Sequence, residues 1–124
     1  MRNEYAGVKI FVQKLYEMRK NMKKIEVQEF NTGTMPVWDV IQRVTKICKK
    51  IGVKHLDLFG SFATGTALPT SDIDFVVYGK VDQFRLEDEL EKIETLRSID
   101  IFYFDEIKNE YLKEDIKKYG KRIY

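Results

Sequence analysis

The chain has 124 residues, of which 22 are basic and 20 acidic, so its formal net charge is only +2. This length predicts one domain with a modest core, and the near balance of charge argues against nucleic acid as a partner, because proteins that bind it usually carry a strongly basic face. The chain has no apolar run near the roughly 20 residues that span a bilayer and only one cysteine, Cys48, so we expect a cytoplasmic protein without disulfides or membrane contact.

The chain is expected to begin with a helical extension over residues 1–34, followed by a domain over residues 35–124. Apolar residues at helical spacing predict an amphipathic helix over residues 4–25, and a weak alternation indicates a short strand over residues 25–30. The basic residues in the last turns of the helix suit the negative end of a helix dipole, so they indicate a solvated helix end and not a nucleic-acid patch.

A second helix is predicted over residues 37–51, where a wide apolar face repeats at helical spacing. Thr34 or Met35 is its expected cap, and Gly52 ends it. The only histidine of the chain, His55, has no cysteine or second histidine nearby to complete a zinc site, so we interpret it as structural.

The rest of the chain alternates strands and helices. Its apolar and polar patterns predict strands over residues 56–59, 72–77 and 98–104, and helices over residues 83–96 and 106–119. This order predicts an α+β fold, in which helices pack mainly on one face of a small mixed β-sheet.

The stretch that carries chemistry runs from residue 58 to residue 77, LFGSFATGTALPTSDIDFVV. A strand enters a turn at Gly60 and Ser61, where the glycine lets the backbone approach a phosphate and the serine offers a hydroxyl and an N–H. Asp72 and Asp74 then alternate onto one face of the next strand. Two carboxylates side by side repel each other, and Mg²⁺ is the expected counter-ion because it prefers oxygen ligands.

Asp100 supplies a third carboxylate. It interrupts an apolar strand, SIDIFYF, and an isolated carboxylate is expensive to bury there without a partner or an ion. If this strand lies beside the Asp-Ile-Asp strand, about 4.8 Å away, Asp100 joins Asp72 and Asp74 as a ligand or as a proton acceptor. The three side chains could then hold two Mg²⁺ roughly 3.5–4 Å apart, as two-metal nucleotidyl transfer requires.

These residues make the chain resemble the minimal nucleotidyltransferase family, a branch of the polymerase-β-like superfamily. The family pattern of Gly-Ser, ten residues and Asp-x-Asp is met by Gly60, Ser61, Asp72 and Asp74, and the third family carboxylate falls on Asp100. The closing sequence, DEIKNEYLKEDIKKYGKRIY, is similar to the last helix and tail of these proteins. The resemblance implies a nucleotidyltransferase fold in which Gly60 and Ser61 bind the nucleotide and the three aspartates are catalytic metal ligands.

The resemblance also implies an activity and a partner. The activity is Mg²⁺-dependent transfer of a nucleoside monophosphate, most often AMP from ATP, to a hydroxyl acceptor. One branch is the antitoxin of MNT–HEPN toxin–antitoxin pairs, which modifies its helical partner, and another resembles the nucleotide-binding half of aminoglycoside nucleotidyltransferases. A catalytically weak antitoxin that acts by contact alone stays open, and so does a homodimer. Many members carry Arg in the Gly-Ser loop, where this chain has Phe62 and Thr64.

The faces of the predicted sheet raise a separate expectation. If helices cover the face of Ile73, Phe75 and Val77, the carboxylate face stays open and also exposes Val76 and Phe102. Apolar groups around an open catalytic face indicate a missing cover. A partner or substrate-binding subunit could supply it, and so could the N-terminal helix of the same chain.

Overall fold

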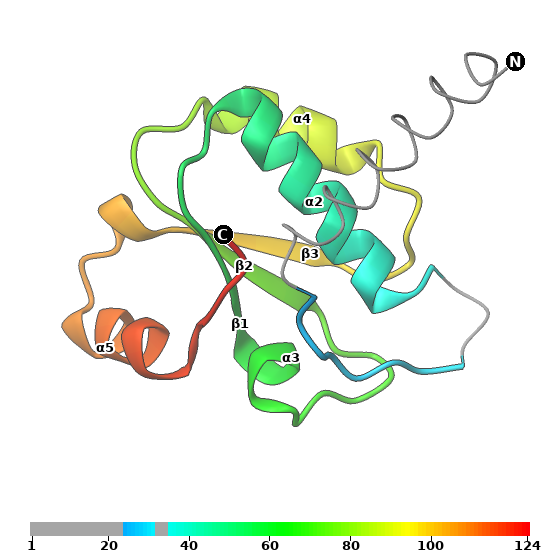
Figure 1. The fold of residues 1–124 in the computed structure, drawn as a ribbon. Coiled ribbons are helices and arrows are strands. Elements are labelled where there is room, and N and C mark those ends of the chain that lie inside the picture. Colours follow the sequence, from blue (N-terminus) through cyan, green and yellow to red (C-terminus); the bar gives the residue numbers. More distant parts are fainter. Residues whose placement is uncertain (1–23, 32–34) are drawn as a thin grey trace, which may run out of the picture.

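The computed structural model describes residues 24–31 and 35–124, so almost all of the helix predicted over residues 4–25 lies outside the described residues. Four strands form one mixed sheet in the order β3-β2-β1-β4 (Figure 1). The strands are β1 (Leu56–Phe59), β2 (Ile73–Val77), β3 (Ile99–Tyr103) and β4 (Lys121–Arg122). β2 runs antiparallel to β1 and parallel to β3, and β4 runs antiparallel to β1.

The helices of the described residues flank this sheet. They are α2 (Val37–Ile51), α3 (Gly60–Thr64), α4 (Gln83–Glu91) and α5 (Glu110–Tyr119), with a 3₁₀ turn η1 (Phe104–Glu106) after β3. The α+β class with a small mixed sheet, predicted from the sequence, is confirmed. No helix in the described part of the chain is long and apolar enough to cross a membrane.

The main core lies between the sheet and the pair α2 and α4. Ile73, Phe75 and Val77 alternate onto this face of β2 and are fully buried there. On the helix side, α2 contributes the apolar stripe that its 3.6-residue periodicity predicted. Gly52 ends α2 in a left-handed conformation, with φ of 99°, as predicted for a helix-terminating glycine.

The other face of the sheet is less open than the sequence suggested. Figure 1 shows α5 on the opposite side of the sheet from α2 and α4. Val76 of β2 is fully buried, although it shares the face of Asp74, and Ile116 of α5 is also buried outside the main core. The prediction that Val76 is exposed is therefore wrong, because a helix from the C-terminal part of the chain covers that half of the face.

The segment before α2 also differs from the prediction. The strand predicted over residues 25–30 is absent from the described structure, where residues 24–31 have no regular secondary structure. The predicted cap Thr34 lies outside the described residues, and Met35 does not cap α2, because the N-cap residue is Pro36, which has no polar side chain. The carboxylate of Glu29 replaces such a cap, since its Oε1 accepts from the Val37 N–H at 2.7 Å and its Oε2 from the Trp38 N–H at 2.9 Å.

Two helix ends are also shifted. α4 ends at Glu91, five residues before the predicted end, and the following turns lead the chain to the start of β3. The last helix begins at Glu110 and not at residue 106, because Asn109 caps it. The Asn109 side chain accepts from the backbone N–H groups of Tyr111 and Leu112.

Candidate functional site

The sheet register brings two of the three predicted carboxylates together. Asp74 of β2 and Asp100 of β3 are direct partners across the parallel pair, so their backbones lie about 4.8 Å apart. The residues on either side of Asp74, Ile73 and Phe75, point into the main core, and alternation therefore turns Asp74 to the opposite face. Asp74 is half-buried and Asp100 is exposed on the strand at the edge of the sheet.

Asp72 lies one residue before β2 and is exposed. Its charge still reaches Asp74, where it contributes to raising the pKa. Within residues 24–31 and 35–124, however, no group of three or more His, Cys, Asp or Glu side chains is close enough to hold a metal ion. The described site is therefore a pair of carboxylates with a third beside it, and not a preformed three-ligand cage.

The electrostatics of Asp74 show that burial and the neighbouring carboxylates both disfavour its charge. Burial, the charge of Asp100, a hydrogen bond with Asp100 and the charge of Asp72 together raise the pKa of Asp74 from 3.8 to about 6, and burial is the largest of these causes. Each of these causes disfavours the carboxylate form. The donor set consists of carboxylate oxygens with uncompensated negative charge, so the residues present fit a hard divalent cation such as Mg²⁺.

The backbone of Gly60 lies in close contact with the Asp74 carboxylate. The last residue of β1, Phe59, is the register partner of Asp74, and α3 begins at the next residue. Gly60 has φ of +69°, and a Cβ built on it would overlap the Asp74 carboxylate. Ser61 follows in the first turn of α3, so the predicted Gly-Ser turn lies directly against one of the predicted metal ligands.

The two positions where many family members carry Arg have different environments. Phe62 is buried to 1% and packs in the main core. Thr64 is exposed, and its hydroxyl bonds with the Thr66 hydroxyl at 2.8 Å. Of these two positions, only Thr64 is open to a substrate.

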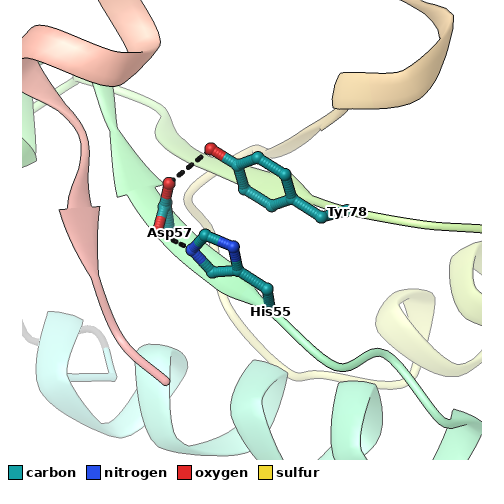
Figure 2. A network of polar contacts seen from close by, with 3 residues as sticks. All are labelled: His55, Asp57 and Tyr78. Atoms are coloured by element: carbon teal, nitrogen blue, oxygen red, sulfur yellow. Dashed lines mark hydrogen bonds and ion pairs between the residues drawn. The ribbon is translucent and has the colours of Figure 1, made fainter.

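The structure also reveals a polar cluster that the sequence analysis missed (Figure 2). Asp57 of β1 is 6% exposed. It accepts a hydrogen bond from the Tyr78 hydroxyl at 2.6 Å and lies 2.7 Å from Nε2 of His55. The ring of His55 stacks on that of Tyr78 with 3.9 Å between centroids. The signal in the sequence was an aspartate between two leucines of a strand, Leu56 and Leu58.

This cluster lies on the carboxylate face, because Asp57 is the register partner of Val76, two residues beyond Asp74. Burial and the bond to Asp57 raise the pKa of Tyr78. The Asp57 carboxylate takes its polar contacts from His55 and Tyr78. Gly120, in the C-terminal part of the chain, also approaches Asp57. The arrangement agrees with a structural role for His55.

Comparisons with known proteins identify the family. Residues 41–123 match the model of the nucleotidyltransferase domain. The chain is also 35% identical over 86 residues to a protein of Methanocaldococcus jannaschii named "Putative protein adenylyltransferase MJ0128", an alignment that covers 64% of this chain and 87% of the relative. The chain therefore belongs to the nucleotidyltransferase domain family and is a nucleotidyltransferase, and the resemblance to the minimal nucleotidyltransferases is confirmed.

Substitution of two glycines tests the contact between Gly60 and Asp74. Gly60→Ala places a methyl group against the Asp74 carboxylate, whereas Gly65→Ala has a similar positive φ, +75°, with nothing within 4 Å of the new Cβ. We expect Gly60→Ala to lower the free energy of unfolding by about 2 kcal/mol more than Gly65→Ala. Urea denaturation of both variants measures the difference, and equal losses would show that the close contact is absent.

Asp74→Asn tests the cost of charging Asp74, to which burial contributes most and the neighbouring aspartates add. Because the folded pKa of Asp74, about 6, exceeds its ordinary value of 3.8, the folded state holds the proton more tightly, and wild-type stability falls as the pH rises from about 4 to about 6. This rise in pKa corresponds to ~3 kcal/mol for a fully buried group, and solvent screening at a half-exposed site reduces it to about 1 kcal/mol.

In metal-free buffer, Asp74→Asn is thus expected to raise the free energy of unfolding by about 1 kcal/mol at pH 7 and to bring no gain at pH 4. Urea denaturation at the two pH values provides the measurement. Asp115→Asn, on the exposed surface of α5, is the matched control. Equal stabilities of wild type and Asp74→Asn at pH 7 would contradict the described electrostatics.

Proposed function

We propose that this nucleotidyltransferase transfers AMP from ATP to a hydroxyl group of a helical partner protein, and that Mg²⁺ supports the reaction. The observation that carries the proposal is the pairing of Asp74 with Asp100 in the register of β2 and β3, directly against Gly60. A pair of carboxylates that the sheet forces together, without compensating charge, is what a metal-dependent phosphate site requires.

The proposed reaction is a displacement at the α-phosphorus of ATP. The acceptor hydroxyl oxygen forms a bond to this phosphorus, the bond to the oxygen that bridges to the β-phosphate breaks, and pyrophosphate leaves. The hydroxyl proton passes to the Asp100 carboxylate, which is exposed at the edge strand and within reach of a docked acceptor. When bound, Mg²⁺ would neutralise triphosphate charge and lower the pKa of the attacking hydroxyl.

The residues of the chain divide this work between them. Asp72 and Asp74 would hold Mg²⁺ through their carboxylate oxygens. Because Gly60 has no side chain, its backbone lies directly against Asp74 and could approach a phosphate closely, and Ser61 would donate from its hydroxyl and N–H. The cation would attract the carboxylates of Asp72 and Asp74 and so offset the repulsion between them and Asp100.

Adenylate as the transferred group and protein as the acceptor are supported by the name of the archaeal relative, which describes it as a protein adenylyltransferase. The surface supports a protein acceptor as well. Leu68, in the loop that leads to Asp72, is 64% exposed, and Leu96, just before β3, is 89% exposed. These exposed apolar side chains, on the segments that lead to Asp72 and to β3, suit a macromolecular acceptor.

A labelling experiment tests this proposal. The chain is incubated with Mg²⁺ and the product of the adjacent reading frame as the candidate partner, using ATP labelled at the α-phosphate or at the γ-phosphate. We expect the partner to retain the α-label only, because pyrophosphate leaves with the β- and γ-phosphates. The double variant Asp72→Asn/Asp74→Asn should lose the transfer by at least about 1,000-fold, while Asp105→Asn/Asp115→Asn, at exposed positions away from the site, should retain it.

Three outcomes would contradict the proposal in different ways. Retention of the γ-label would indicate phosphoryl transfer. Undiminished labelling by Asp72→Asn/Asp74→Asn would show that the carboxylates are not the catalytic site. A partner that is inhibited by wild type and double variant alike, with no label, would identify a binding module that acts by contact.

A further inference from the structure

The three carboxylates differ in how the fold holds them. Asp74 and Asp100 lie inside strands and are fixed by the backbone ladder of β2 and β3. Asp72 lies outside β2, at the end of the loop over residues 66–72 that follows α3, in which Ala67 is buried and Leu68, Pro69 and Thr70 are exposed. A metal ligand on a loop needs support from other groups if its carboxylate is to keep one position.

Arg97 supplies this support from the residues just before β3. Its Nη1 donates to the carbonyl of Pro69 at 2.7 Å and to the carbonyl of Ser71 at 3.1 Å. The N–H of Ile73 donates to the carbonyl of Ser98 at 2.9 Å. The residues on both sides of Asp72 are therefore tied to two consecutive residues, Arg97 and Ser98.

The same guanidinium joins the loop to α3. Its Cζ lies 5.3 Å from the ring centroid of Phe30 and 5.4 Å from that of Phe62, and the two rings meet edge to face at 6.3 Å. Phe62 directly follows Ser61 in α3. Arg97 thus packs against the helix of the Gly-Ser turn while it binds the loop that carries Asp72.

Gln28 fixes the start of the same loop. Its Oε1 accepts from the N–H of Ala67 at 2.7 Å, and its Nε2 donates to the carbonyl of Ala67 at 3.3 Å. One side-chain amide therefore satisfies both polar groups of one loop residue, across 39 positions of sequence. Gln28 precedes the residues that match the family model, which begin at residue 41.

We propose that Gln28 and Arg97 form a loop clamp, a pair of positioning residues that hold Asp72 where it can complete the metal and nucleotide site. The inference rests on the proposed function for the identity of the metal and the nucleotide. Gln28 lies outside the family match, so the inference gives that segment a role in the reaction. Gln28 is a positioning residue because it acts on Asp72 only through the loop. Without the clamp, the pair of Asp74 and Asp100 stays in the sheet, but Asp72 loses its fixed position.

The test uses the full chain and the variants Gln28→Ala and Arg97→Gln. Mn²⁺ is the probe, and electron paramagnetic resonance measures its binding to the protein alone. We expect each variant to bind Mn²⁺ about 10-fold more weakly than wild type. The kcat of adenylate transfer should fall by a similar factor and the metal concentration for half-maximal activity should rise, while the KM for the acceptor stays the same.

Hydrogen exchange reports on the loop directly. The amides of Ala67 and Ser71 are bonded within the clamped loop, and we expect Gln28→Ala to speed their exchange without affecting the amides of β1 and β2. The two variants act on one loop, so their combined effect on Mn²⁺ affinity should be smaller than the product of the single effects. Glu26→Ala and Arg43→Gln, both at exposed positions, are the matched controls.

The outcomes separate this inference from the proposed function. Folded variants with wild-type Mn²⁺ affinity and an active wild type would overturn the loop clamp. If Arg97→Gln fails to fold, Gln28→Ala decides the question through Mn²⁺ binding and hydrogen exchange. A wild type that transfers no nucleotide, with variants that bind Mn²⁺ more weakly, would overturn the proposed function and support the clamp.

Discussion

Repulsion between two carboxylates held in register is the interaction on which the site depends. Asp74 and Asp100 are direct partners on adjacent parallel strands, and the pKa of Asp74 rises to about 6 because burial and the neighbouring aspartates disfavour its charge. The strands cannot slide apart to relieve this repulsion, because a shift of one residue would expose the apolar side chains on the opposite face. The divalent cation that we propose would relieve it without any change in the fold.

The rest of the fold holds Asp74 in this position. α2 and α4 cover the face of Ile73 and Phe75, so Asp74 is framed by residues anchored in the core. The antiparallel pairing of β1 with β2 brings Gly60 against Asp74. The glycine turn and the carboxylates are therefore two parts of a single packing arrangement, and the family match over residues 41–123 covers all of it. Gln28 and Glu29, from outside that match, stabilise its loop and its first long helix.

The sequence predicted the parts of this structure that depend on local patterns. Short apolar runs located β1 and β2, alternation separated Asp74 from its core neighbours, and the spacing from the Gly-Ser turn to Asp-x-Asp indicated the candidate site, which stays a prediction. The adjacency of Asp100 and Asp74 depended on a conditional expectation, that β3 lies beside β2, and the structure has this pairing. Helix ends were less accurate, because capping by Asn109 competes with several nearby polar residues.

Contacts between distant residues were beyond sequence reasoning. The bond of Tyr78 to Asp57 spans 21 positions, and that of Gln28 to Ala67 spans 39. The burial of Val76 under the C-terminal part of the chain also follows from tertiary packing, since its alternation with Asp74 alone indicated exposure. Each of these features depends on which elements meet in space, and no periodicity in one segment carries that information.

Anomalous diffraction from a crystal of the protein with Mn²⁺ and a non-hydrolysable ATP analogue tests the central claim most directly. Our account predicts a manganese peak that the carboxylate oxygens of Asp72 and Asp74 coordinate, with the analogue's phosphates completing its ligands and Asp100 facing the same site. A nucleotide bound with no manganese at these aspartates, or a lysine or arginine side chain in the place of the ion, would contradict it.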